Sequence, residues 1–348
     1  MHDLVKLEKI SFEESLGKHV LPSLCIGCAS CVAVCPIGCL EYVNGRPILT
    51  KECTSCGICS QVCPRYKLSI PKLEEFIFGR ERKPDEEFGI YRCIIAARTR
   101  DDRIREVCQD GGVVTSLLLY ALEEGIIDGA VVSGVDREKP LKAVPKIAES
   151  SEEIIKSAGT RYTYSPNILA LRDAVTRGKK NVAFVGTPCQ IQAVRKIQAL
   201  PLNRYARRIG FIIGLFCSEC FSYDGLVDGL IRGKLGINPE EVEKMNIKGS
   251  LIITTTKGRV EKVSLKEAKR YVSNCVYACR DFSSELADIS VGGLGLAGWT
   301  LTILRTERGE EIFEEAESNG LLETRPIERG SKALSLLFKL SKRKRQEA

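Results

Sequence analysis

The spacing of apolar residues changes near residue 91 of the chain. From there, short apolar runs, which predict strands, alternate with longer segments that are apolar at helical spacing. We expect strands over 93–97, 128–133, 181–185, 209–216, 251–256 and 300–306, and helices over 112–124, 152–158, 190–200, 223–235 and 310–318. This alternation predicts an α/β domain with a mixed sheet over residues 91–348.

The residues before this domain follow another pattern. Residues 1–70 are expected to form a small domain of their own, with a β-hairpin around Asn44-Gly45. Residues 71–90 contain prolines and a run of charges, which is typical of a linker or a surface-wrapping arm. The predicted boundaries are therefore 1–70, 71–90 and 91–348.

Two stretches of the small domain have the same cysteine spacing. Residues 25–36 and 53–64 each read C-x2-C-x2-C-x3-C-P. Bacterial ferredoxins use this spacing for [4Fe-4S] clusters, and the fourth thiolate of each cluster comes from the other run. The alternatives are zinc knuckles or disulfides, but zinc is usually held by two C-x2-C pairs. We assign Cys25, Cys28, Cys31 and Cys63 to one cluster, and Cys53, Cys56, Cys59 and Cys35 to the other. Cys39, just beyond the first run, is expected to be a small core residue.

Composition narrows the class of protein. No stretch approaches the roughly 20 apolar residues of a membrane span, and the start of the chain has no signal-peptide core. Sixteen cysteines without an export signal predict metal ligation in a reducing cytoplasm. The net charge of +7 lies partly in the tail 339–345, which we interpret as a solvated terminus or a docking contact with an acidic partner, in preference to a nucleic-acid or membrane contact. Because His2 and His19 are the only histidines, acid–base catalysis by histidine is excluded from the large domain.

Cysteines of the large domain also stand at the ends of predicted elements. They are Cys189, Cys217, Cys220, Cys275 and Cys279. Such placement favours a third cluster, although buried free cysteines are a common alternative.

Three loops of the large domain have unusual chemistry. Residues 109–112 open a helix with two glycines, which suits an anion but also an ordinary cap or turn. Residues 158–167 combine hydroxyls, an arginine and aromatics, and could bind a flavin or form a polar surface loop. Residues 292–299 are glycine-rich but lack the strand-to-helix order of a dinucleotide fingerprint.

Residues 91–330 resemble the beta subunits of coenzyme F420-reducing hydrogenase and F420-dependent formate dehydrogenase. The matching stretches are 109–112, 159–167, 188–190, 214–217, 285–292 and 298–299. With the ferredoxin part, the whole chain is similar to the electron-input subunit of archaeal F420H2 dehydrogenase complexes. The resemblance implies a flavin domain that binds FAD, coenzyme F420 as substrate, and a third [4Fe-4S] cluster.

The resemblance also implies site residues. The third cluster would take Cys189, Cys217, Cys279 and Cys275, with Cys220 as the alternative to Cys275 because the family's C-x2-C spacing is C-x3-C here. Arg161 stands where the family has lysine. The implied cofactor-binding residues are Asp110, Gly111, Gly112, Ser116, Thr160, Arg161, Tyr162, Ser165, Asn167, Thr187, Gln190, Gly292 and Trp299.

The implied reaction is the oxidation of F420H2. A hydride passes to FAD, and single electrons leave through the clusters to a partner complex that reduces quinone or methanophenazine. A soluble acceptor (ferredoxin, heterodisulfide reductase or glutamate synthase) is the alternative, and a flavin-free electron relay is a non-enzymatic one. We expect a cytoplasmic protein, held at the inner face of the membrane through its partner, without a transmembrane segment or a nucleic-acid ligand.

Overall fold

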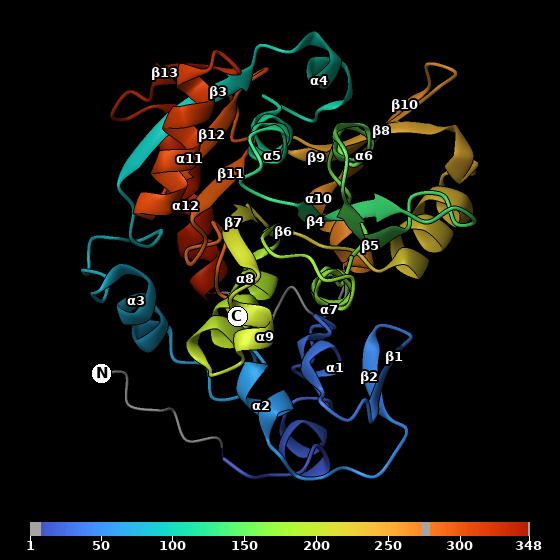
Figure 1. Ribbon diagram of the computed structural model, residues 1–348. Coiled ribbons are helices and arrows are strands. Elements are labelled where there is room, and N and C mark those ends of the chain that lie inside the picture. The colour runs from blue at the N-terminus through green and yellow to red at the C-terminus, as the bar shows by residue number, and fades with distance from the viewer. Residues whose placement is uncertain (1–7, 273–278, 347–348) are drawn as a thin grey trace.

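A large mixed sheet is the centre of the fold (Figure 1). The computed structural model describes residues 8–272 and 279–346. The strand order is β13-β3-β12-β11-β7-β6-β4-β5. The strands are β3 (Cys93–Thr99), β4 (Gly129–Val135), β5 (Ala143–Ala148), β6 (Val182–Gly186), β7 (Ile209–Leu215), β11 (Ile289–Gly292), β12 (Thr300–Leu304) and β13 (Leu322–Pro326).

Strand direction brings many loops to one edge of this sheet. Strands β4, β6, β7 and β11 are parallel to their neighbours in this series. Strand β12 is antiparallel to both β11 and β3, so β3 points the same way as the parallel group. The carboxyl ends of β3, β11, β7, β6 and β4 therefore lie along one edge.

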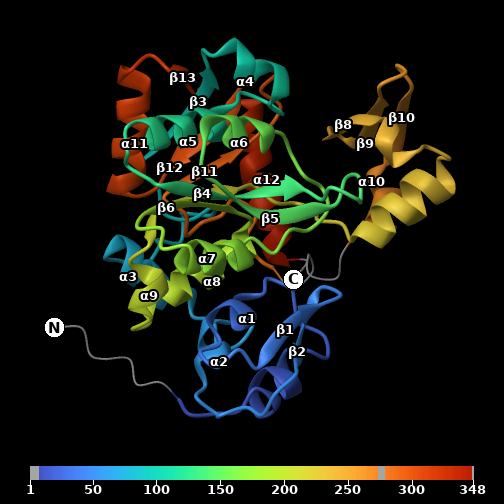
Figure 2. The same cartoon turned by 45° about the vertical axis from the view of Figure 1, so that its right-hand side comes forward.

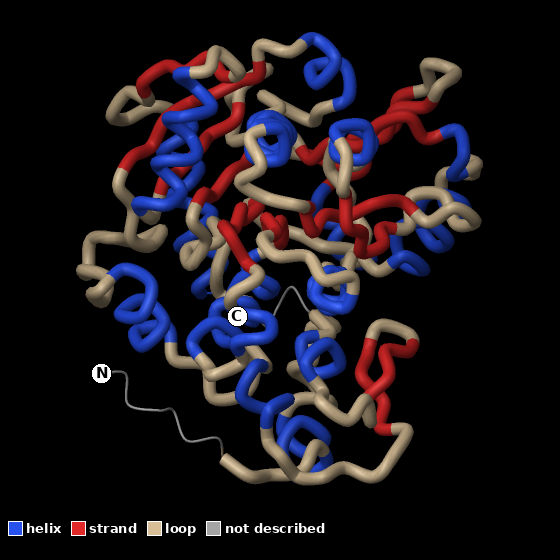
Figure 3. Tube along the Cα trace, in the orientation of Figure 1, coloured by secondary structure: helices blue, strands red, loops and turns tan. Residues whose placement is uncertain are grey.

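Helices cover both faces of the sheet (Figures 1 and 3). One face packs on α5, α6 and α11, through a core that includes Leu117 and Phe313. The other face packs on α7, α8 and α9, and its end on α12. The bounds are α4 (Asp102–Val107), α5 (Val113–Glu123), α6 (Ser151–Lys156), α7 (Ile168–Thr176), α8 (Pro188–Ala199), α9 (Asn203–Ala206), α11 (Glu307–Ser318) and α12 (Lys332–Gln346).

A smaller antiparallel sheet stands to one side of the large one (Figure 2). It packs on the π-helix η2 around Leu230 and Ile253. Its elements are η2 (Asp224–Lys234), η3 (Pro239–Glu241), β8 (Val242–Ile247), β9 (Ser250–Thr255), β10 (Val260–Ser264), α10 (Leu265–Ala268) and η4 (Lys269–Tyr271).

The cysteine-rich module lies against α7, α8 and α9 (Figure 2). Its hairpin turns at Asn44-Gly45, where both residues have positive φ, as the two-residue turn requires. Helix α3 then connects the module to the large sheet. The elements are η1 (Glu13–Gly17), α1 (Ser30–Val34), β1 (Leu40–Val43), β2 (Arg46–Leu49), α2 (Ile58–Val62) and α3 (Ile70–Phe78).

The mixed α/β architecture and the hairpin are confirmed. Each strand and helix predicted in the large domain is present within a few residues of its expected bounds. The prediction that the basic tail is a solvated terminus is wrong. Residues 332–346 form α12, and Lys344 is only 5% exposed, so this tail is not a solvated terminus. No helix in the described part of the chain is both long and apolar enough to cross a membrane.

Candidate functional site

The carboxyl edge of the large sheet holds most of the residues predicted to bind cofactors. Asp110 follows β3 and α4, Thr187 follows β6, Cys217 follows β7, and Gly292 ends β11. In open α/β sheets, ligands bind at the carboxyl ends of the strands. This edge is therefore the candidate ligand-binding site.

One group of predicted residues meets around Asp110. Its carboxylate lies so close to Gly293 that any side chain there would collide with it. The neighbouring Gly111 amide donates to Thr300 Oγ1 (3.0 Å), which ties the loop to the start of β12. Burial raises the pKa of Tyr162 to about 12, and the nearby Asp110 carboxylate contributes to the rise. The structure thus brings together three loops that are far apart in sequence.

A second group surrounds the start of α8. Ser165 Oγ donates to Asn167 Oδ1 (2.6 Å), and Asn167 Nδ2 donates to the Val185 carbonyl (2.9 Å). Thr187 and Gln190 form the capping box of α8, and Gln190 Nε2 also donates to the Ser165 carbonyl. These polar groups are already bonded to one another, so they form a framework at the carboxyl end of β6.

The helix N-terminus and the 158–167 loop differ in their access to solvent. Gly112 precedes α5 with φ 74°, and Ser116 is buried and donates to Thr99 Oγ1 (2.8 Å). Thr160 is exposed. Arg161 Nε is buried and has no hydrogen-bond partner, and burial lowers the pKa of this guanidinium. Arg161 Nη2 donates to the Lys156 carbonyl (3.5 Å), so Nε is the donor left unpaired. A guanidinium with an unpaired donor fits an anionic group such as a phosphate.

Trp299 and Gly292 are packed within the protein. Trp299 is 8% exposed, and the guanidinium carbons of Arg98 and Arg325 lie 4.5 and 4.3 Å from its ring centroid. Gly292 has Phe216 so close that a Cβ would overlap its ring. Their direct contact with a cofactor stays a prediction.

Four cysteines, which we call the inner set, meet on the side of the module that faces the large sheet. Burial, and then the neighbouring thiols of Cys63 and Cys25, raise the pKa of Cys28 to about 12. Burial and the thiols of Cys28, Cys63 and Cys25 likewise raise the pKa of Cys31. Cys63 thus joins the cysteines of the first run. The inner set is Cys25, Cys28, Cys31 and Cys63.

The remaining four cysteines of the runs, which we call the outer set, line a single pocket. They are Cys35, Cys53, Cys56 and Cys59. Burial, and then the thiols of Cys56, Cys53 and Cys35, raise the pKa of Cys59 to about 12. Among the described residues, no group of three or more His, Cys, Asp or Glu side chains is arranged to hold a single metal ion.

Backbone amides point at sulfurs of both sets. The Phe12 amide donates to Cys53 Sγ and the Arg65 amide donates to Cys63 Sγ, each at 3.4 Å. Such hydrogen bonds accompany iron–sulfur ligation and adjust cluster potentials. The two sets therefore fit [4Fe-4S] clusters in their donor chemistry.

Matching left-handed residues shape both runs. Ala29 (φ 62°) precedes α1 and Gly57 (φ 73°) precedes α2, each between the second and third cysteine of its run. A left-handed residue turns the chain sharply, which wraps the run around one centre. The strain at Ala29 is a feature that the sequence alone does not reveal.

Helix α8 connects the inner set to the carboxyl edge of the sheet. Lys196 Nζ donates to the carbonyls of Cys63 and Tyr66, both at 2.7 Å. Arg65 Nη2 donates to Gln192 Oε1 (2.5 Å). The same helix begins next to the predicted ligand Cys189. The local sequence pattern gives no sign of these contacts.

Cysteines of the large domain gather beside α8. Cys189, Cys220 and Cys279 are buried in one core cluster, and Cys217 packs against it. Burial, and then the Cys189 thiol, raise the pKa of Cys279 to about 12. The Cys217 amide donates to the Phe282 carbonyl (2.9 Å), which joins two of the loops. Cys275 lies outside the described residues.

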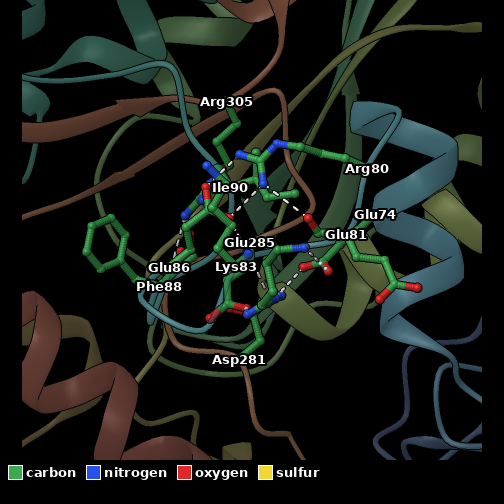
Figure 4. Close-up of polar contacts among 12 residues, drawn as sticks. Glu74, Arg80, Glu81, Lys83, Glu86, Phe88, Ile90, Asp281, Glu285 and Arg305 are labelled. Carbon is green, nitrogen blue, oxygen red and sulfur yellow. Dashed lines mark hydrogen bonds and ion pairs between the residues drawn. The ribbon is translucent and has the colours of Figure 1, made fainter.

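A buried ionic network fixes the segment that follows Cys279 (Figure 4). Arg305 is 1% exposed and donates to the Ile90 carbonyl (2.9 Å) and to Ser290 Oγ (2.6 Å). Glu285 accepts from Arg82 Nη1 (2.5 Å). Burial, and then Glu285, raise the pKa of Asp281 to about 7. This network was not predicted, although the charged residues inside the 281–288 stretch are a visible signal.

The C-terminal helix reaches the same region. Lys344 Nζ donates to the Ser218 carbonyl (3.0 Å), and Arg345 pairs with Glu285 (2.8 Å). Arg343 lies 3.9 Å from Glu219. The basic residues of the tail therefore hold the loop between Cys217 and Cys220.

Comparison with known proteins assigns both parts of the chain. Residues 94–172 and 179–330 match the N-terminal and C-terminal parts of the coenzyme F420 hydrogenase/dehydrogenase beta subunit. The chain belongs to this family. Residues 24–68 match the 4Fe-4S dicluster domain, which confirms the ferredoxin interpretation of the doubled run.

Relatives of this F420 hydrogenase/dehydrogenase family member cover nearly the whole chain. It is 31% identical over 95% of its length to a subunit of the F(420)H(2) dehydrogenase of Methanosarcina mazei, and it covers 92% of that subunit. It is 36% identical over 97% of its length to the coenzyme F420-dependent sulfite reductase of Methanocaldococcus jannaschii, of which it spans only 53%. Among solved structures it resembles a chain of the F420-reducing [NiFe] hydrogenase complex from Methanosarcina barkeri, with 39% identity, a TM-score of 0.72, and coverage of 76% of this chain and 92% of that one. These relatives are F420-linked oxidoreductases, which supports an oxidoreductase role.

Proposed function

We propose that this chain oxidises reduced coenzyme F420 by hydride transfer to bound FAD and passes single electrons through [4Fe-4S] clusters to a partner complex. The observation that carries the proposal is the position of helix α8 between the carboxyl edge of the sheet and the inner set. The helix begins beside Cys189 at the carboxyl edge, and its Gln192 and Lys196 hold the segment that follows Cys63. One rigid element therefore connects the candidate flavin edge to the inner set.

The chain's own residues would hold each group. Bound FAD accepts a hydride and releases electrons singly, and bound [4Fe-4S] clusters carry single electrons. The inner and outer sets would each hold one cluster. Cys189, Cys217, Cys279 and Cys275 would hold a third, with Cys220 as the alternative to Cys275.

Charged residues at the carboxyl edge support an anionic cofactor and substrate. The unpartnered Arg161 Nε would receive a phosphate of FAD. Lys244 and Lys248 are exposed and lie near Asp110, where they oppose the rise that burial causes in its pKa. These lysines would attract the anionic tail of F420. The remaining predicted loop residues would shape the site around the two ring systems.

The acceptor is proposed from the relatives. The match to a subunit of the F(420)H(2) dehydrogenase of Methanosarcina mazei supports a multi-subunit partner. As that partner we propose a complex at the cytoplasmic face of a membrane, which reduces quinone or methanophenazine. The second candidate is a soluble acceptor. The match to the coenzyme F420-dependent sulfite reductase, of which this chain spans 53%, shows that a similar chain occurs within a longer protein. In both cases the outer set is the exit toward the acceptor.

Anaerobic reconstitution with iron, sulfide and FAD tests the function. We expect FAD to bind and F420H2 to reduce a viologen dye. The return of F420 absorbance measures this reaction. We also expect about twelve irons per chain, four for each cubane. A count of about eight would remove the third cluster and leave the two in the ferredoxin module.

Comparison of one variant with the wild type separates the possible failures. Arg161→Gln should weaken FAD binding without loss of iron, because Arg161 lies outside all three cysteine groups. If neither this variant nor the wild type takes up flavin or oxidises F420H2, while iron is retained, the chain is a flavin-free relay. That result would contradict the proposed function.

A further inference from the structure

A fifth cysteine faces the outer set. Cys39 lines the same pocket as Cys35, Cys53, Cys56 and Cys59. Its Sγ lies 3.4 Å from Cys35 Sγ, and its side chain is 3% exposed. The sulfurs are too far apart for a disulfide, whose bond length is about 2 Å, and close enough to share a proton.

The backbone holds this thiol in place. The Gly38 amide donates to the Cys35 carbonyl (3.3 Å) in a tight turn, and Gly38 adopts φ 60° with open space on its side-chain face. The Cys39 carbonyl accepts from the Thr50 amide (2.9 Å) at the end of the hairpin. Cys39 is thus directed to the pocket by a turn on one side and a hairpin on the other.

The second run has the same turn without the thiol. The Tyr66 amide donates to the Cys63 carbonyl (3.3 Å), as Gly38 does to Cys35. The residue that follows is Lys67, whose Nζ leaves the cluster region to pair with Glu8 (2.7 Å). The inner set therefore lacks a counterpart of Cys39 at this position, and the chain contains its own matched control.

We propose that Cys39 is a second protein ligand for the outer cluster, able to replace Cys35. The inference rests on the proposed assignment of a cluster to the outer set. Either thiolate offers iron the same soft sulfur donor and the same charge. In the exchange, the iron–sulfur bond to Cys35 breaks and the bond to Cys39 forms. The proton of the Cys39 thiol moves across 3.4 Å to the Cys35 sulfur, and no electron is gained or lost.

The exchange gives the outer cluster a protected ligand. Cys35 is half-exposed, whereas Cys39 is buried. Reagents in solvent that modify the Cys35 thiol would therefore leave a ligand that they cannot reach. The inner set has no need of such a reserve, because three of its four thiols are buried.

Four variants of the full chain test the inference, each reconstituted anaerobically and measured by iron and sulfide content and by electron paramagnetic resonance after reduction with dithionite. They are Cys35→Ala, Cys39→Ala, the double variant, and Cys63→Ala as the matched control. We expect Cys39→Ala to keep the wild-type iron content. Cys35→Ala should also keep it, with a changed resonance spectrum of the outer cluster.

The double variant should lose iron from the outer cluster, up to about four per chain, and so should Cys63→Ala from the inner cluster. The unaffected cluster in each variant reports that the module is folded. Loss of iron from Cys35→Ala equal to that of the double variant, including conversion to a three-iron cluster, would overturn the inference. A wild-type chain that binds no iron would contradict the proposed function instead.

Discussion

The inner and outer sets have the same cysteine spacing but different surroundings. The inner set is mostly buried, and Lys196 of α8 donates a hydrogen bond to the carbonyl of its member Cys63. The outer set has three half-exposed thiols around a pocket, with Ile37 exposed at its edge. The same spacing thus occurs in two different environments. In the proposed function, the inner set receives electrons from the large domain and the outer set passes them to the acceptor.

Removing one ligand from each set should have the largest effect. In Cys31→Ala, we expect F420H2 to reduce the flavin but not the outer cluster, because the inner cluster that connects them is lost. In Cys59→Ala, F420H2 should still reduce the inner cluster. Each variant should lose about four irons, and electron paramagnetic resonance would identify the reduced cluster. Unimpaired reduction of the outer cluster in Cys31→Ala would reverse the assigned order.

Loss of the buried arginine should destabilise the large domain by about 4 kcal/mol. Arg305→Met removes the buried cation near Asp281 and leaves the Ile90 carbonyl without its donor, whereas Glu285 keeps its pairs with Arg82 and Arg345. Urea unfolding under anaerobic conditions measures the change. Both ferredoxin sets lie outside this network, so their iron content should be kept.

A matched control is available on α11 for this variant. Arg308 forms an exposed pair with Glu311, so Arg308→Met should change stability by less than about 1 kcal/mol. Equal effects of the two substitutions would show that the buried network is not what holds the Cys279 segment.

Loss of the hydrogen bonds from Lys196 to the segment that follows Cys63 should have a moderate effect. Lys196→Met removes two hydrogen bonds from a cation to backbone carbonyls, which should cost about 2 kcal/mol of stability. We also expect slower reduction of the inner cluster by F420H2 in rapid-mixing experiments. The exposed Lys180→Met is the control, and should match the wild type in both measurements. Normal reduction rates in Lys196→Met would mean that this contact does not position the two sites.

The smallest expected effect concerns the pair of Arg80 and Glu86, in the segment between the module and the large sheet. Arg80, by hydrogen bonding, lowers the pKa of Glu86 from its ordinary value of 4.5 to about 2. The lowered pKa stabilises the folded state above pH 4.5, and this contribution is lost as pH falls toward about 2. The pair is partly exposed, so the contribution is less than about 1 kcal/mol. The difference in urea stability between wild type and Glu86→Gln should shrink between pH 6 and pH 4, and a difference that grows would contradict the assignment.

Much of the fold follows from periodicity. The long apolar segments became β3, α5, β6, α8 and β7, because each is buried along most of its length. Strands β5 and β11 were missed, since the first contains Pro145 and Lys146 and the second is four residues long. Helix α12 was missed because its charges concealed an apolar stripe through Ala333, Leu337 and Leu340.

The candidate site was predictable where ligand spacing is local. The two cysteine runs show their chemistry in the sequence, and the crossing of Cys63 to the first run followed from a known pattern. The contacts that hold the cysteine-bearing segments in position could not be predicted from local spacing. Lys196, Arg65 and Lys344 reach partners more than a hundred residues away, and only tertiary packing determines such pairs.

The long reach of α12 has a consequence for how the protein is made. All ligands of the inner and outer sets have left the ribosome once residue 63 and a short following segment have emerged. The loop that carries Cys217 is bonded to Lys344, and Glu285 is bonded to Arg345, so these contacts form only after residues 344 and 345 have emerged. The ferredoxin module can therefore be loaded with iron on the nascent chain before the contacts that hold the loop between Cys217 and Cys220 have formed.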